Sequence, residues 1–189
     1  MREPRRALHA RIAESSENRF PEIAENQPEL LARHCTEAGL IEKAAGLWGK
    51  AGQRSLERSA LVEAAEQLKR ALDQIATLPA TPALRRKQIE LQVALITPLI
   101  HVKGYVAVET KAAGERARLL IEQAEALGEP PEDQLLLFSV LYGFWAANYI
   151  AFNGDAMREL ASQFLELAGK QAAKVPIMIG HRLMAVHKC

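Results

Sequence analysis

Apolar residues recur every three or four positions along most of the chain, which is the spacing of an amphipathic helix. No stretch alternates apolar and polar residues over the length of a strand. Proline and glycine residues divide the helical pattern into segments joined by short links. The expected helices are 4–19, 28–38, 41–59, 61–77, 82–102, 105–127, 131–152, 156–172 and 175–187. The pattern therefore predicts an all-α protein.

Several residues at the expected helix ends have the chemistry of stop or start signals. Gly39 follows the second predicted helix, as a C-terminal glycine does. Thr81 before Pro82 is typical of an N-cap with proline at the first helical position. Asp155 is expected to cap the helix from 156. Pro98 lies inside the predicted helix 82–102, where we expect a kink or an early end.

The segment 134–154 contains no Lys, Arg, Asp or Glu and is long enough to cross a membrane. Its polar residues Ser139, Asn148 and Asn153 and the acidic residues on its flanks argue against a membrane span. We expect a central buried helix here.

The composition narrows the class of protein. Apolar residues make up 49% of the chain, which is enough for a packed core and too many for a disordered segment. The 24 basic and 23 acidic residues give a net charge of +1, which argues against a nucleic acid or an anionic membrane as partner. Two cysteines do not form a disulfide framework or a four-thiolate zinc site. The chain opens without a secretory leader pattern, so we expect a cytoplasmic protein.

A repeat pattern begins at Trp48. Gly52 follows four residues later on the same predicted helix, and the next helix carries Ala64, Leu68 and Ala71. This spacing resembles the tetratricopeptide repeat, a helix-turn-helix unit of about 34 residues. Small residues allow two helices to approach closely, and Trp48 or Leu68 fills the remaining space. The resemblance implies stacked helical hairpins in a tetratricopeptide-like right-handed α-solenoid; an irregular helical bundle is the alternative.

A closer resemblance covers most of the chain and is strongest from Arg5 to Gly104. The matching runs are RRALHARIAE at 5–14, QPELLARH at 27–34, TEAGL at 36–40, EKA at 42–44, KAGQR at 50–54, ERSA at 57–60 and TPLIHVKGY at 97–105. They resemble bacterial multidomain signalling proteins that combine a class III adenylate/guanylate cyclase domain, an AAA-type (STAND-like) ATPase domain and a tetratricopeptide-like C-terminal region.

That resemblance implies two parts in this chain. Residues 1–26 would correspond to the end of an upstream ATPase module, and residues 27–189 to helical repeats, truncated at the C-terminus. The last helix would then expose an apolar face that contains Ile177, Leu183 and Val186. The chain contains no Gly-x-x-x-x-Gly-Lys-Ser/Thr phosphate loop, and no aspartate pair of a cyclase can be assigned. We therefore expect the family's enzymatic domains to lie outside it.

The uncharged segment also carries the candidate binding residues. Phe138, Tyr142, Trp145, Tyr149 and Phe152 are spaced by four and three residues and fall on one face of the predicted helix. They either line a groove for a partner or fill the gap between neighbouring hairpins. In the first case Tyr142, Trp145, Asn148 and Tyr149 are the partner-groove candidates.

The sequence offers no catalytic, cofactor or metal site. None of the five histidines forms a His-x-x-x-His pair, and Cys35 lies among apolar helix positions as a small buried residue. The carboxylates are spaced for salt bridges along helix surfaces. We expect a chain that is not itself an enzyme and binds no cofactor.

Two functions fit these observations. The first is a non-catalytic protein-interaction module, a scaffold or sensor, of a bacterial signalling or regulatory protein. Its partner would be a protein or peptide, with self-association through the C-terminal helix as a further option. The alternative is a helical domain that senses a small-molecule effector and regulates an upstream ATPase or cyclase.

Overall fold

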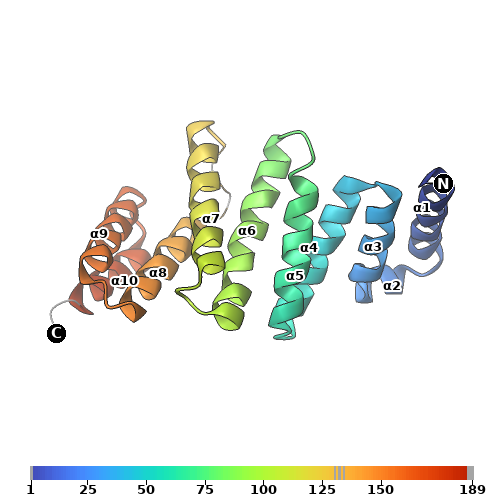
Figure 1. Ribbon diagram of the computed structural model, residues 1–189. Helices are drawn as coiled ribbons and strands as arrows, with labels where there is room; N and C mark the ends of the chain where they lie inside the picture. Colours follow the sequence, from blue (N-terminus) through green and yellow to red (C-terminus); the bar gives the residue numbers. More distant parts are fainter. Residues whose placement is uncertain (1, 130, 132, 134, 187–189) are drawn as a thin grey trace. The chain divides into compact units, whose positions relative to one another are not determined.

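The computed structural model of the chain describes residues 2–129, 131, 133 and 135–186. Within these residues all regular structure is helical, which confirms the predicted all-α class. The helices are α1 Arg2–Arg19, α2 Pro21–Asn26, α3 Pro28–Ala38, α4 Ile41–Glu57, α5 Leu61–Ile75, α6 Pro82–Lys103, α7 Val108–Ala126, α8 Leu135–Ile150, α9 Gly154–Lys170 and α10 Lys174–Ala185. Figure 1 shows them along the chain.

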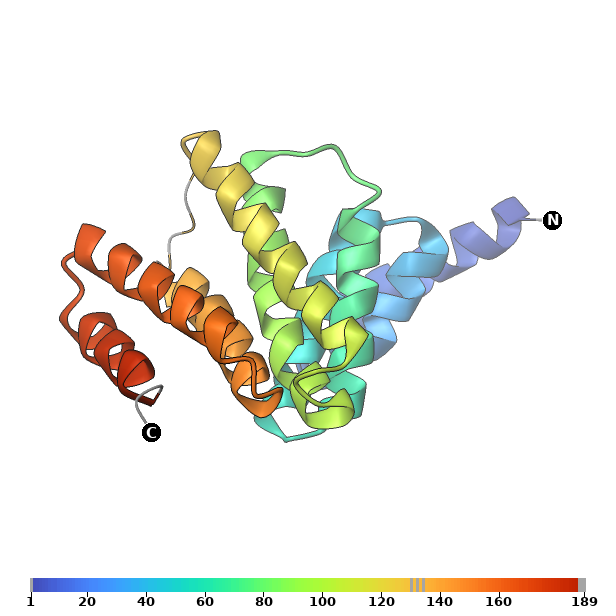
Figure 2. The same ribbon diagram turned by 60° about the vertical axis from the view of Figure 1, so that its left-hand side comes forward.

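The chain divides into two compact units, residues 1–98 and 99–189. In the first unit α3 packs on α1 and α4, and α4 packs on α5 (Figure 1). In the second unit α8 packs on α7 and α9, and α9 packs on α10 (Figure 2). Most of these pairs are consecutive helices, whereas α1 and α3 are separated in the chain by the short helix α2. The predicted division after residue 26 falls between α2 and α3 and stays a prediction.

The helix boundaries follow the signals in the sequence closely. Helix α3 has the predicted bounds, with Pro28 in its first turn, and Thr81 accepts a hydrogen bond from the backbone N–H of Leu84 at 3.2 Å. Two expectations are corrected. Helix α6 does not end early at Pro98 but continues to Lys103, and the alternative of a kink there stays a prediction. The boundary between the two units falls between Pro98 and Leu99. The side chain of Asn153, not that of Asp155, caps α9 by accepting from the N–H of Ala156 at 3.3 Å.

A left-handed backbone conformation ends five of the described helices. Gly39, Ser59, Gly128, Phe152 and Ala172 have φ between 49° and 73°. At each site the N–H of the next residue bonds to a carbonyl five positions back, for example Leu40 to Cys35 at 2.9 Å and Asn153 to Asn148 at 2.9 Å. These are the bonds of a Schellman cap, which closes a helix and turns the chain back. The chain thus makes its hairpins with one repeated local device, even where glycine is absent.

The interface between α4 and α5 is packed around a glycine. A Cβ atom on Gly52 would lie 2.6 Å from Cγ of Leu68, so α5 can approach α4 only where this side chain is missing. The residues of the predicted repeat pattern, Trp48, Ala64, Leu68 and Ala71, have exposed fractions between 0% and 3%. Trp48 also donates from Nε1 to the hydroxyl of Thr36 at 3.1 Å, and this hydroxyl donates to the carbonyl of Ala32 at 2.8 Å. The tight contact therefore links α3, α4 and α5.

The uncharged segment forms α8, and its ends differ from the predicted ones. The helix has 16 residues and lies within the second unit. None of the described helices is both long enough and apolar enough to cross a membrane.

The first prediction concerns the space at Gly52. Replacement of Gly52 by Ala should lower the free energy of unfolding by about 1–2 kcal/mol, because the new methyl group collides with the buried Leu68. Gly46 lies in the same helix with no atom within 4 Å of its would-be Cβ, so Gly46→Ala should raise stability by up to about 1 kcal/mol. Urea unfolding followed by circular dichroism measures both. Equal effects of the two substitutions would contradict this account of the α4–α5 contact.

Candidate functional site

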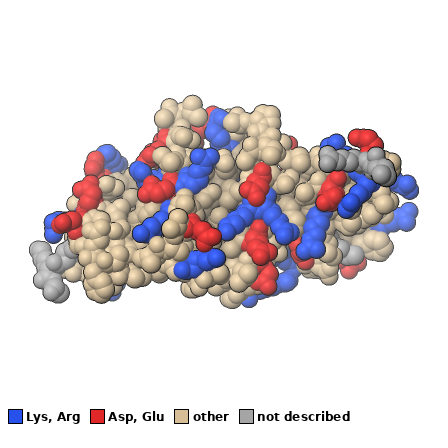
Figure 3. Space-filling model, viewed as in Figure 1, with Lys and Arg blue, Asp and Glu red and all other residues tan. Residues whose placement is uncertain are grey.

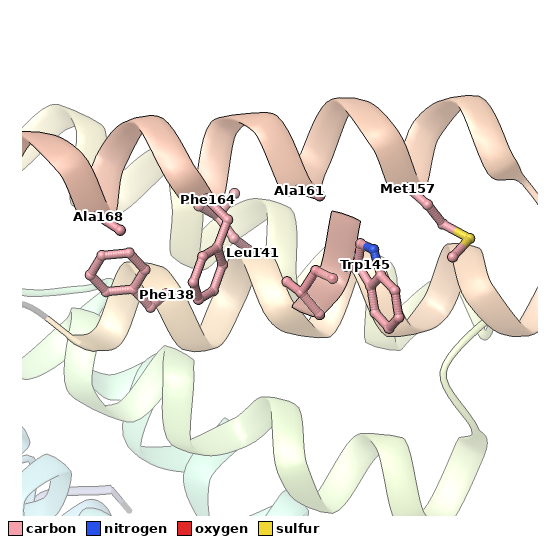
Figure 4. Packing of buried hydrophobic residues seen from close by; sticks show 8 residues of the cluster. Phe138, Leu141, Trp145, Met157, Ala161, Phe164 and Ala168 are labelled. Atoms are coloured by element: carbon pink, nitrogen blue, oxygen red, sulfur yellow. The ribbon is translucent and has the colours of Figure 1, made fainter. Parts of the chain in front are cut away.

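The core of the second unit lies between α8 and α9 (Figure 4). Phe138 of α8 packs near Phe164 of α9, with their ring centroids 4.9 Å apart at a tilt of 56°. Ala161 and Ala168 of α9 are fully buried, and their small side chains leave room for the large apolar residues of the neighbouring helices. The cluster consists of Phe138, Leu141, Trp145, Met157, Ala161, Phe164, Ala168 and Leu183.

This packing divides the aromatic residues of α8 into two groups. Phe138 and Trp145, seven positions apart, are 5% and 7% exposed and belong to the core. Tyr142 and Tyr149 lie about 40° further around the helix axis and are 47% and 52% exposed. Phe152 lies beyond the helix end and is 94% exposed. The two interpretations of the stripe, core and surface, thus apply to different residues.

The exposed tyrosines are held against the buried tryptophan. The ring of Tyr149 stacks on Trp145 at 5.5 Å and 13°, and the ring of Tyr142 lies 6.3 Å from it at 24°. Aromatic pairs at these distances are attractive. The indole Nε1 of Trp145 is buried and has no hydrogen-bond partner within the described part of the chain. A buried N–H without an acceptor is costly, and a bound acceptor would remove that cost.

An apolar groove of about 880 Å³ borders this row of rings. Helix α8 lines it with Leu135, Phe138, Ser139, Tyr142 and Trp145. Helix α10 lines it with Val175, Pro176, Ile179, Arg182 and Leu183. Val186, the C-cap of α10, and Phe164 of α9 also belong to the lining. Of the four partner-groove candidates, Tyr142 and Trp145 therefore line the groove. Asn148 and Tyr149 are not among the described lining residues, and Asn148 donates to the carbonyl of Phe144 at 2.9 Å.

The apolar face of helix α10 is more buried than the sequence predicted. Leu183 is 5% exposed and Ile177 packs against the α8–α9 cluster, so the expectation that both lie on an exposed face is wrong. The reason is that α9 supplies the small residues against which α10 packs, such as Ala168. Exposed apolar side chains do occur on α10 and at its C-cap: Val175 is 66%, Met178 72% and Val186 39% exposed. Of these, Val175 and Val186 line the groove.

Charge is distributed differently in the groove and on the rest of the surface. On the face in Figure 3, basic and acidic side chains are interspersed, in keeping with the net charge of +1. Helix α8 has no charged residue, whereas α10 carries Lys174, Arg182 and His181 and no carboxylate. Arg182 is the charged residue in the described lining of the groove. The α10 wall therefore favours an acidic over a basic occupant.

Cys35 has the environment of a structural residue. Its side chain is fully buried in α3. Burial raises the pKa of the Cys35 thiol above its ordinary value; Lys43 opposes this shift, and Glu17 adds to it. The thiol is thus kept in its protonated, weakly nucleophilic form.

Within the described residues, no three His, Cys, Asp or Glu side chains are placed to hold a metal ion together. His187 and Cys189 lie outside the described residues. The sequence did not indicate that His9 of α1 meets His34 of α3: their Nδ1 atoms are 2.9 Å apart. The two residues are 25 positions apart on helices that are not consecutive, so helix periodicity cannot find the pair.

The comparison with known proteins gives one relative. The chain is 26% identical over 192 aligned residues to an uncharacterized protein of Rhizobium meliloti (strain 1021). The alignment covers 98% of this chain and 17% of the relative, so the chain spans about a sixth of that protein's length. No protein-family model and no solved structure matches the chain.

The second prediction concerns Cys35. In a Cys189→Ser variant, where Cys35 is the remaining thiol, a soluble disulfide reagent should label the native protein at least about tenfold more slowly than the urea-unfolded protein. Burial both lowers the thiolate fraction and blocks access to it. The absorbance of the thiolate that the reagent releases measures the rate of labelling. Fast labelling of the native protein would contradict the buried, protonated state.

Proposed function

We propose that the chain is a non-catalytic, tetratricopeptide-like interaction module of a larger regulatory protein. In this proposal the groove between α8 and α10 binds an amphipathic helix of a protein partner. The helix presents apolar side chains to the groove and acidic side chains to Arg182. The groove is the observation that carries the proposal.

The groove has the features of a protein-binding surface. Apolar side chains dominate its lining, and several remain exposed to water, including Leu135 at 55% and Val175 at 66%. Contiguous apolar surface of this kind is costly in water unless something covers it. Aromatic residues such as Tyr142 and Trp145 are the side chains that most often dominate binding energy at protein interfaces.

The dimensions of the groove favour a helix as occupant. Leu135 and Trp145 lie ten positions apart on α8, which corresponds to about 15 Å along the helix axis. A bound helix of about three turns would match that length and place apolar residues at positions i, i+3 or i+4 and i+7 on the groove. The absence of carboxylates on α10 favours acidic residues beside this apolar stripe.

The proposal that the chain works within a larger regulatory protein rests on its resemblance to cyclase–ATPase proteins and on the long Rhizobium meliloti relative. Helical hairpins that pack in chain order, and the Gly52–Leu68 contact at the repeat positions, support a tetratricopeptide-like stack. A relative of much greater length supports the view that such a segment works within a larger chain. The resemblance to cyclase–ATPase signalling proteins makes a regulatory arm the proposed setting.

A small-molecule effector is the second candidate occupant. Its support is the buried, unpaired Nε1 of Trp145 beside a groove of about 880 Å³, a volume within the usual range for ligand pockets. An apolar ligand with one hydrogen-bond acceptor would pair with this N–H. In that case the domain would sense an effector for an upstream module.

The third prediction uses two tyrosines of the same helix as a matched pair. The probe is a synthetic helical peptide with leucine at positions i, i+3 and i+7 and glutamate at flanking positions. Tyr142→Ala should weaken its binding about tenfold, because Tyr142 lines the groove. Tyr149→Ala removes a ring of similar exposure outside the groove lining and should change binding less than about twofold. Isothermal titration calorimetry measures both, and thermal unfolding verifies that the variants fold.

A charge reversal tests the orientation of the peptide. Arg182→Glu should weaken binding of the glutamate peptide and improve binding of a peptide with lysine at the same positions. A peptide of the same composition without the apolar stripe should not bind. Equal effects of Tyr142→Ala and Tyr149→Ala, or no binding of any helical peptide, would contradict the proposal.

A further inference from the structure

A second cavity lies in the first unit, separate from the groove on α8. It has a volume of about 600 Å³ and is lined by residues of α1, α3 and α5, with Trp48 of α4 also in its wall. Trp48 is 3% exposed and held by its hydrogen bond to Thr36, so this wall is rigid. The volume is within the range of small-molecule sites.

Cationic and imidazole side chains from three helices meet in this cavity. Arg5 and His9 come from α1, Arg33 and His34 from α3, and Arg70 from α5. The acidic residues of the lining are Glu37 and Asp73, so the formal charge is three positive against two negative with both histidines neutral. The lining therefore carries a net positive formal charge.

The guanidinium groups are weakly engaged by the protein itself. Arg5 reaches Glu37 at 3.9 Å, and both side chains are more than half exposed, so this ion pair contributes little. The guanidinium of Arg70 lies 4.8 Å above the ring of Trp48. Arg33 has no ion pair within the described residues. Donors from all three arginines are thus available to a bound oxyanion.

Two further features define the ligand. The buried Oε1 of Gln74, a lining residue, lacks a hydrogen-bond partner in the described part of the chain and needs a donor such as a hydroxyl group. The Nδ1 atoms of His9 and His34 are 2.9 Å apart, a contact that requires one N–H and one lone pair. Both imidazoles belong to the cavity lining, so they border a bound ligand.

We propose that this cavity binds a small phosphate ester that carries hydroxyl groups, a site that goes beyond the helix groove proposed above. Three arginines, one from each of three helices, line the cavity, and a phosphate offers three terminal oxygens to their donors, whereas a carboxylate offers two. The phosphate oxygens accept from the arginines, and a hydroxyl group donates to Gln74.

The fourth prediction tests this site with ribose 5-phosphate as the probe. Isothermal titration calorimetry on the full chain should detect binding of ribose 5-phosphate, weaker binding of inorganic phosphate and no binding of ribose. Arg33→Gln and Arg70→Gln should each weaken binding about tenfold, because each removes a charged hydrogen bond. Lys69→Gln, on α5 beside Arg70 and outside the described lining, should change binding less than about twofold.

Absence of ribose 5-phosphate binding, or equal losses from Lys69→Gln and Arg70→Gln, would overturn the site. Equal affinity for inorganic phosphate and ribose 5-phosphate would overturn the assignment of a hydroxylated ester, and stronger binding of malate would overturn the assignment of a phosphate. None of these outcomes bears on the helix groove, whose probe and variants lie in the other unit.

Discussion

The contact between α8 and α9 is the constraint on which the candidate site depends. Phe138 and Trp145 are buried between the two helices, and Ala161 and Ala168 provide the space for close packing. This fixes the rotation of α8 about its own axis, which in turn directs Tyr142 toward solvent. Leu183 packs into the same cluster and anchors α10 as the second wall of the groove. A single dense contact thus sets both walls and leaves an apolar surface between them.

In the first unit too, a small residue lets two helices pack closely, and here that residue is a glycine. Gly52 lets Leu68 approach the α4 backbone, and Trp48 bridges to Thr36 on α3. In both units one helix supplies small residues and its neighbour supplies large ones, and left-handed caps turn the chain between them. Such units are suited to stacking, because each helix can pack on the helix before it and the helix after it. This packing of small against large residues, with left-handed caps between the helices, is the physical basis of the proposed tetratricopeptide-like stack.

The parts of the fold that could be predicted from the sequence are those set by residues at the helix ends. Pro28 and Gly39 define α3 because each acts on its own helix end. The short helix α2 was missed, since six residues hold too little periodicity to be recognised. Asn153 and Asp155 lie in one turn and can both cap a helix, so composition alone favoured the wrong one.

The sites required information that periodicity does not contain. Spacing placed the aromatic residues of α8 on one face but could not tell that α9 covers Phe138 and Trp145 and leaves Tyr142 exposed. The α10 wall was unforeseen because Leu183 and Val175 share a helix yet differ in burial. The cavity around His9 and His34 unites helices that are distant in the sequence. The sequence pattern predicted which segments are helical. It could not predict how deeply each side chain is buried or which distant helices are in contact.

The most direct test of the helix groove observes Trp145 itself. The chain has two tryptophans, Trp48 in the first unit and Trp145 in the second, so two indole N–H resonances are expected in a ¹⁵N-labelled sample. Titration with the leucine–glutamate helical peptide should shift the Trp145 Nε1–H resonance and leave that of Trp48 unchanged, since Trp48 already donates to Thr36. Shifts of both resonances, or of neither at peptide concentrations that saturate binding, would contradict the claim that the α8–α10 groove is the binding site.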